Sequence, residues 1–371
     1  MSVRARSKMV NSRVLTLLLL LLASTPTATW AEEPRLMEVD VAGGKIFGMP
    51  VHWGRADAAL LTPAGRMHIL KTSEILHHQV LNHPYVPQSL SAAKNQLQQE
   101  LGNRFEVQVA GPYVLATPRG QGKRWQSRFI SLLGGYQRYF QVRGWQIRRA
   151  DFPLIVIVFP SRSEFLQYAS HEIGSLPPKA VGSYFPSSNR CILYQIPGHQ
   201  GTNWSETEAT IVHEAVHQLA YNSGVHERLF QNPLWFVEGL ATMFERPAVY
   251  ELGVERSQAA SRVHYGQLKV AANALTNPQQ LSHEFEGLIM SDELFRRDPH
   301  LAYALSWSLT FYLAERMPQQ YQRLMRAQAS HPFGSYSAES RLSDFRRAVG
   351  TSVPNLALQV SRFYEEFSPA R

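Results

Sequence analysis

Short alternating and apolar runs separated by turn residues dominate the first part of the chain. Residues 35–86 contain several such runs, with turns at Gly43-Gly44, Gly54 and Pro63-Ala64-Gly65. This pattern predicts short β-strands. From Ser89 to Leu101, apolar residues recur every three or four positions and Gly102 follows, which predicts a helix. We therefore expect residues 32–101 to form a small β-rich region that ends in a helix.

The middle of the chain mixes strand and helix patterns. Apolar and aromatic residues at helical spacing, with basic residues between them, predict a helix around Trp125–Phe140 with a solvated basic face. A second helix is expected to begin at Ser161. Strands are predicted at Phe105–Thr117, Leu154–Phe159, Gly182–Phe185 and Cys191–Ile196, the last two joined as a hairpin by a Pro-Ser-Ser-Asn turn. Because the remainder is mainly helical, the predicted fold class is α+β.

The N-terminus has the layout of a secretory signal peptide. Arg4, Arg6, Lys8 and Arg13 precede the apolar run Val14–Ala23, and small polar residues then lead to Ala31. The apolar run is far shorter than the ~20 residues that span a bilayer, so cleavage after Ala31 is preferred over a permanent anchor. We expect residues 1–31 to be removed and the mature protein to be exported, periplasmic or extracellular, with no stable membrane span.

Charge and cysteine content narrow the classes of partner and cofactor. The formal net charge of +8 falls to about +4 without the first 31 residues, which hold four basic residues and no acidic ones. No long Lys/Arg run is present, so nucleic acid is not an expected partner. Cys191 is the only cysteine, which excludes an internal disulfide, a cysteine-based zinc finger and an Fe–S cluster. In its apolar strand Cys191 is predicted to be buried and inert.

The segment His213-Glu214-Ala215-Val216-His217 has the form H-E-x-x-H within a predicted helix that ends at Asn222-Ser223-Gly224. Residues four apart lie on one face of a helix, so His213 and His217 can direct their imidazoles at one metal ion. Glu214 is rotated about 100° from His213, which leaves its carboxylate free to act as a base. The alternative is that both histidines only form hydrogen bonds with neighbouring residues and bind no metal.

A catalytic zinc site usually needs a third protein ligand, and a second predicted helix supplies one. This helix covers Asn232–Glu245, with Asn232 as N-cap and Pro233 in the first turn. Glu238 and Glu245 lie seven residues apart on its otherwise apolar face, where unpaired carboxylates are costly. We predict Glu238 as the third ligand and Glu245 as the acceptor for a ligand imidazole N–H. His226 is expected to be a surface or loop histidine.

These residues resemble a known group of enzymes. His213-Glu214-x-x-His217, then Trp235-x-x-Glu238-Gly239-x-Ala241 and Glu245, is similar to the gluzincin, or peptidase MA-like, zinc metallopeptidases. The metzincin pattern is not met, because position 220 is Ala and position 223 is Ser. The wider chain is similar to exported bacterial proteins that are grouped only as a domain of unknown function in that superfamily.

The resemblance implies a zincin-like metallopeptidase domain over residues 102–371 and one Zn²⁺ per chain. It implies that Glu214 activates water and that Tyr303 donates a hydrogen bond to the oxyanion. His300 is an alternative donor, and Tyr303 would then only be a packing residue of the core. Related enzymes lay an extended peptide on an edge strand, here expected at Cys191–Ile196. No Gly-x-Met-Glu-Asn motif is present, so an endopeptidase is favoured over an aminopeptidase.

The expected function is an exported zinc peptidase that acts on a peptide or protein substrate. The alternative is a non-catalytic metal-binding or scaffold protein of the cell envelope that keeps the same fold. Glu214 separates the two, because a binding protein needs no general base beside its metal.

Overall fold

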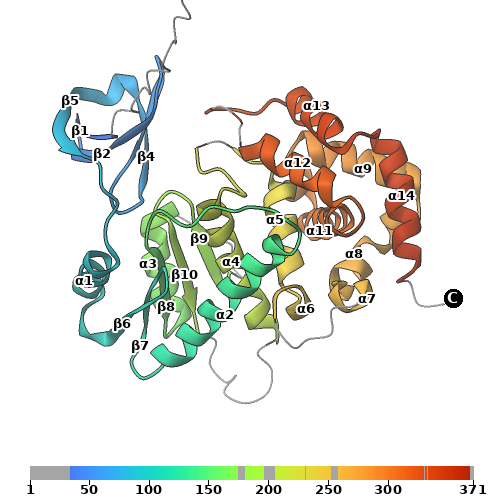
Figure 1. The fold of residues 1–371 in the computed structure, drawn as a ribbon, viewed down its shortest axis with the longest axis horizontal. Helices are drawn as coiled ribbons and strands as arrows, with labels where there is room; N and C mark the ends of the chain where they lie inside the picture. The colour runs from blue at the N-terminus through green and yellow to red at the C-terminus, as the bar shows by residue number, and fades with distance from the viewer. Residues whose placement is uncertain are drawn as a thin grey trace, which may run out of the picture. The chain divides into compact units, whose positions relative to one another are not determined.

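The computed structural model describes residues 34–367 except 174–179, 196–204, 230, 252–257, 330 and 332. Two β-sheets come first along the chain, and a helical part follows (Figure 1). The fold is mixed α+β with a β-rich N-terminal region and a helical C-terminal part, as the sequence predicts. The predicted signal peptide and its cleavage site lie outside the described residues and stay predictions. Among the helices that are described, none has both the length and the apolar character to cross a membrane.

The first sheet is antiparallel throughout, with the strand order β4-β3-β2-β1-β5. Its small apolar core contains Met37, Val39 and Leu60. Its strands are β1 (Arg35–Val41), β2 (Gly44–Trp53), β3 (Asp57–Leu61), β4 (Met67–Lys71) and β5 (Ile75–Pro84), with the short 3-10 helix η1 (Thr72–Glu74) before β5. The predicted run of short strands is confirmed.

The second sheet has the strand order β6-β7-β8-β10-β9. Strands β7, β8 and β10 are parallel, and the two outer strands run antiparallel to their neighbours. Its strands are β6 (Phe105–Ala110), β7 (Tyr113–Pro118), β8 (Leu154–Phe159), β9 (Gly182–Phe185) and β10 (Arg190–Tyr194).

Two predictions about this sheet are wrong. The expected single strand Phe105–Thr117 is a hairpin, because the chain reverses at Gly111, whose φ is +56°, and at Pro112. The hairpin of β9 and β10 is confirmed, but β10 is not the edge strand: it lies between β8 and β9. The edge is β9. Ile196, the predicted end of the second strand, lies outside the described residues.

Helices cover both faces of the second sheet. The helices α1 (Leu90–Leu101) and α3 (Arg162–Ile173) share a core with one face, and α2 (Gly122–Gln141) and α4 (Ser205–Ser223) share a core with the other. Ser89 is the N-cap of α1, and its side chain accepts from the Ala92 N–H. A 3-10 helix, η2 (Gly102–Arg104), links α1 to β6. The helix α1 thus packs on the second sheet. The predicted boundary that assigns α1 to the N-terminal region stays a prediction.

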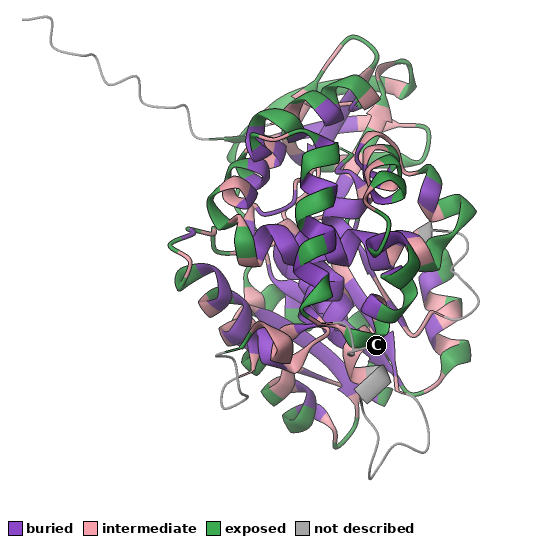
Figure 2. Ribbon diagram, turned by 90° about the vertical axis from the view of Figure 1, so that its right-hand side faces the viewer, coloured by how far each residue is buried: buried purple, intermediate pink, exposed green. Residues whose placement is uncertain are grey.

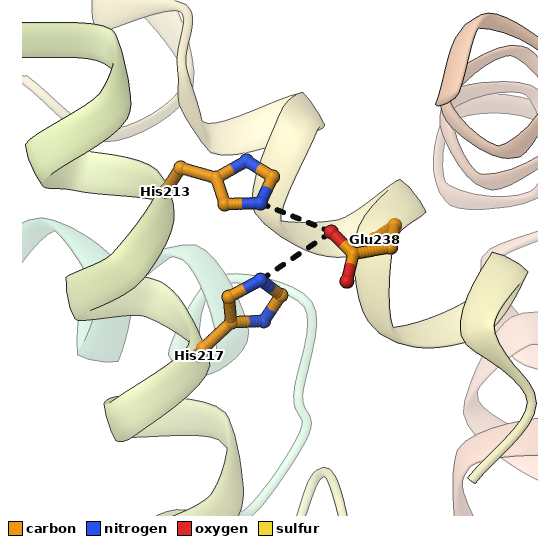
Figure 3. Close-up of side chains that lie close together, drawn as sticks. All are labelled: His213, His217 and Glu238. Carbon is orange, nitrogen blue, oxygen red and sulfur yellow. Dashed lines mark hydrogen bonds and ion pairs between the residues drawn. The ribbon is translucent and has the colours of Figure 1, made fainter. Parts of the chain in front are cut away.

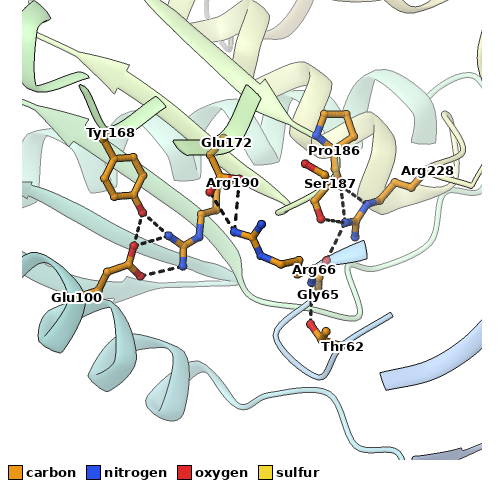
Figure 4. A network of polar contacts seen from close by, with 10 residues as sticks. All are labelled: Thr62, Gly65, Arg66, Glu100, Tyr168, Glu172, Pro186, Ser187, Arg190 and Arg228. Carbon is orange, nitrogen blue, oxygen red and sulfur yellow. Dashed lines mark hydrogen bonds and ion pairs between the residues drawn. The ribbon is translucent and has the colours of Figure 1, made fainter. Parts of the chain in front are cut away.

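Loop contacts join the first sheet to the rest of the described chain (Figure 4). The Arg228 guanidinium donates to the carbonyl oxygens of Gly65 at 2.7 Å and Pro186 at 2.8 Å. Arg66 pairs with Glu172 of α3 at 3.1 Å. The turn after β3 is thereby tied to the turn that follows β9.

The helical part is built around α11 (Pro299–Arg316), whose residues from Ala304 to Ala314 are all buried. Figure 2 shows the described chain coloured by burial, with buried residues in the interior and exposed residues on the outer helices. The helix α5 packs along it closely enough that a Cβ at Gly239 would lie 2.5 Å from the Ser306 carbonyl oxygen and would overlap Thr310 Oγ1. The helices of this part are α5 (Leu234–Phe244), α6 (Pro247–Tyr250), α7 (Ala259–Arg262), α8 (Tyr265–Leu275), α9 (Pro278–Met290), α10 (Glu293–Arg297), α11 (Pro299–Arg316), α12 (Pro318–Ala329), α13 (Ala338–Val349) and α14 (Val353–Glu365).

The start of α5 differs from the prediction. Pro233, not Asn232, is the N-cap residue, and it makes no side-chain hydrogen bond that caps the helix. The Leu234 N–H donates instead to Asp292 Oδ1 at 3.1 Å, and Asn232 Oδ1 accepts from the Glu227 N–H at 3.2 Å. The cap therefore comes from a residue distant in the sequence, which local pattern cannot identify.

Candidate metal centre

The helices α4 and α5 bring His213, His217 and Glu238 together (Figure 3). Both histidines lie on the face of α4 that looks at α5, as their spacing of four residues requires. Glu238 Oε2 lies 3.0 Å from His213 Nε2 and 3.4 Å from His217 Nε2. The three ligand atoms all lie within 4.8 Å of one another, and both histidines are only 8% exposed.

This group is suited to hold a metal ion. Two imidazole nitrogens and one carboxylate oxygen, the atom types that bind divalent metals, converge on one small region. The His217 Nδ1 atom is buried with no hydrogen-bond partner, so Nε2 is the nitrogen that engages the group. Nitrogen and carboxylate ligands of this kind bind several divalent metals, so the ligand set alone does not select one ion.

The charges in the group are strongly coupled. Burial disfavours the imidazolium of His213, but the hydrogen bonds to Glu238 and Glu245 outweigh burial and raise its pKa well above the ordinary value. Burial likewise disfavours the Glu238 carboxylate, but the neighbouring His217 and the hydrogen bond from His213 lower the pKa of Glu238. A proton on His213 thus balances the carboxylates, and a metal ion would take over that balance.

Glu245 lies where the sequence predicts, beside the imidazole of His213. It follows the last residue of α5, and its Oε1 accepts from His213 Nδ1 at 2.8 Å. Its second oxygen, Oε2, lies 3.0 Å from Nε2 of His264, the N-cap residue of α8. Sequence reasoning missed His264, because a histidine before a helix is an ordinary N-terminal residue and nothing local connects it to Glu245.

Glu214 is in contact with the edge strand β9. Its Oε2 accepts a hydrogen bond of 2.8 Å from the backbone N–H of Tyr184 on the edge strand β9. A Cβ at Gly182 of the same strand would meet Glu214 Cγ at 3.4 Å and would overlap Leu193. The edge strand therefore holds the carboxylate of Glu214 in place.

A cleft of about 400 Å³ opens over these residues. Its lining combines the site with apolar and aromatic side chains and with β9: Ala180, Val181, Gly182, Ser183, Tyr184, Pro186, Thr210, His213, Glu214, His217, Tyr221, Leu234, Val237, Glu238 and Tyr303. The site is thus reachable by a ligand that lies along the edge strand.

Tyr303 lines this cleft from α11, with its ring centroid 6.2 Å from that of His213. Burial, followed by the carboxylates of Glu238 and Glu214, raises the pKa of Tyr303, so its hydroxyl keeps its proton and can donate. His300, the alternative donor, is exposed at the start of α11 and is not among the residues that line the cleft.

Two other candidate residues are placed apart from the ligand group. His226 lies in the loop after α4, as one of the two predicted alternatives has it, but it is not a surface residue. It is only 1% exposed, because its ring packs edge-on between Tyr221 and Phe236. It does not belong to the group of potential ligands. Cys191 is buried as predicted, and burial raises the pKa of its thiol, which keeps it protonated.

The close approach of α5 to α11 leads to a stability prediction. Gly239→Ala should lower the free energy of unfolding by about 1–3 kcal/mol, because the added methyl overlaps Ser306 and Thr310 and no free space can take it. Gly287→Ala is the matched control: a Cβ there meets nothing within 4 Å in α9, so this change should leave stability equal or higher. Urea unfolding of both variants checks the difference. Equal stability of the two would contradict the packing described for Gly239.

Comparison with known proteins finds one match to a family model, which covers about a third of the chain and names no function. Residues 207–334 match the family described as a protein of unknown function (DUF1570). This stretch includes His213, Glu214, His217, Glu238 and Tyr303, and it begins inside α4. No curated protein matches the chain.

Proposed function

We propose that this protein is an exported zinc-dependent peptidase of the gluzincin type, and that it cleaves within polypeptides. The observation that carries the proposal is the convergence of His213, His217 and Glu238 beside the carboxylate of Glu214 in one open cleft. A site that only stores a metal has no need of a base at its open side. The zincin-like domain over residues 102–371 is part of the same proposal.

In this proposal His213, His217 and Glu238 hold one zinc ion. Bound zinc would act as a Lewis acid that polarises the scissile carbonyl and makes water a better nucleophile. Glu214, held by the Tyr184 N–H, accepts a proton from the attacking water and returns it to the departing amine. Tyr303 donates a hydrogen bond to the oxygen that becomes negative as the carbonyl is attacked.

The cleft fits an extended peptide better than the end of a chain. Tyr184 directs its N–H away from β10 and toward Glu214, so its carbonyl also lies on the open edge of β9, free to pair with a substrate strand. The lining residues that the structure describes include no Lys or Arg that could bind a terminal carboxylate. The first feature supports an endopeptidase, and the second argues against a carboxypeptidase.

The test is cleavage of casein by the purified mature protein, together with its metal content. We expect about one zinc per chain, hydrolysis that stops when a chelator removes the metal, and recovery when zinc is returned. Zinc without any cleavage of casein or of a broad peptide library would favour the metal-binding scaffold. A protein that binds no zinc would overturn the proposal altogether.

Tyr303→Phe should slow turnover by roughly 100-fold or more while metal content and fold are retained, because only the donated hydrogen bond is lost. KM should change less than kcat, since the oxygen becomes negative only in the transition state. Steady-state kinetics on a fluorogenic peptide measures both constants. An unaltered kcat would show that Tyr303 is a packing residue. The matched control is Tyr312→Phe, which removes a hydroxyl from the same helix at a position that does not line the cleft and should leave both constants unchanged.

A further inference from the structure

We propose that His264 is a positioning residue for the metal centre: it orients Glu245, which in turn orients the imidazole of the ligand His213. The inference rests on the proposed metal site and extends it by one residue from a third helix. It assigns a role to a histidine that does not touch the ligand group itself.

A continuous set of hydrogen bonds links the start of α8 to the ligand atoms. The Gln267 N–H in the first turn of α8 donates to His264 Nδ1 at 3.3 Å. His264 Nε2 lies 3.0 Å from Glu245 Oε2, and Glu245 Oε1 lies 2.8 Å from His213 Nδ1. The other nitrogen of His213 faces Glu238. Three helices, α8, α5 and α4, thus contribute to the orientation of one imidazole ring.

The helix end determines where the proton of His264 lies. A backbone N–H can only donate, so Nδ1 of His264 must be the acceptor and carry no proton. In the neutral ring the proton is then on Nε2, which donates to Glu245. With this hydrogen bond in place, Glu245 stays a carboxylate and accepts from His213 Nδ1, which leaves His213 Nε2 for the metal.

The surroundings of these side chains limit other arrangements. The side chains of His264, Glu245 and His213 are 20%, 17% and 11% exposed, so water has little access to replace a lost partner. Trp307 of α11 packs its ring against that of His264 at 6.2 Å and 66°. Capping α8 needs only Nδ1, so the contact of Nε2 with Glu245 serves something other than the helix end.

Two substitutions separate the role in the cap from the role toward Glu245. The Asn side-chain oxygen stands close to the position of Nδ1 in histidine, so His264→Asn keeps the cap and loses the donor to Glu245. The longer Gln side chain places its amide near the position of Nε2, so His264→Gln keeps the donor and weakens the cap. The measurements are zinc affinity, by competition with a chromogenic chelator, and Tm of the metal-free proteins.

We expect His264→Asn to lower zinc affinity about 10-fold, because a partner that supports a ligand typically contributes this much. Its Tm should fall as well, since Glu245 loses a donor that water has little access to replace. His264→Gln should keep the affinity within about 2-fold of wild type and lose about 2 °C in Tm. Wild-type affinity in His264→Asn would overturn the inference and leave His264 a helix cap. If wild type itself binds no zinc, the metal site fails first, and this role for His264 fails with it.

Discussion

Glu238→Ala is expected to abolish tight zinc binding. Glu238 supplies the oxygen on which both histidines converge, and no other carboxylate in the described part of the chain belongs to the ligand group. With one of three ligands gone, affinity should fall by more than the ~100-fold that loss of a supporting partner can cost. His213→Ala and His217→Ala should have the same effect. Metal analysis after dialysis, followed by chelator competition, measures the loss.

A matched control distinguishes ligand loss from a general effect of substitution. His300→Ala removes an exposed histidine that does not line the cleft, and should keep one zinc per chain. Near-UV circular dichroism of each variant shows whether the fold survives. Full zinc retention in a folded Glu238→Ala protein would refute the gluzincin assignment and make the buried His226 the next candidate ligand.

Glu214→Gln is expected to keep the fold and the zinc while losing hydrolysis by about 100- to 10,000-fold. The change is nearly isosteric, and the amide oxygen of Gln can still accept from the Tyr184 N–H at the edge strand. In the proposed mechanism, the change removes the basic oxygen that takes the proton from water. Neither the metal ligands nor Tyr303 can take over this proton transfer, since the ligands are engaged and Tyr303 is kept protonated.

The comparison needs wild type and Glu214→Gln at equal zinc content, each with and without chelator, on casein. A contaminating protease would ignore the substitution, so equal cleavage by both proteins would remove the main support for the enzyme. Loss of cleavage together with loss of zinc would instead show that Glu214 supports the metal.

Local patterns were sufficient for most of the fold and for the core of the site. The spacing of His213, Glu214 and His217 on one helix, and of Glu238 and Glu245 on the next, depends only on helical geometry. The structure brings the side chains of His213, His217 and Glu238 together, as the sequence predicts, and it places Glu245 beside His213. Their roles as ligands, and that of Glu214 as base, stay predictions that the experiments above address.

The features that sequence reasoning missed depend on residues far apart in the chain. Asp292 caps α5 across 58 positions, and His264 reaches Glu245 across 19. The position of β9 at the edge depends on which strands pair in the folded sheet. A hairpin pattern in the sequence does not show which of its two strands pairs with the rest of the sheet. Both halves of the hairpin at Gly111 have a pattern typical of strands, alternating in β6 and largely apolar in β7, so local pattern predicts one continuous strand.

The hydrogen bond from Tyr184 to Glu214 has a consequence for how the protein tolerates mutation. Its donor is a backbone N–H, which every residue type except proline supplies, so most single substitutions at position 184 leave this support intact. The support of His213 is different, because it passes through the side chains of Glu245 and His264, and most single substitutions at either position remove it. Random substitutions therefore leave the orientation of Glu214 unchanged more often than that of His213.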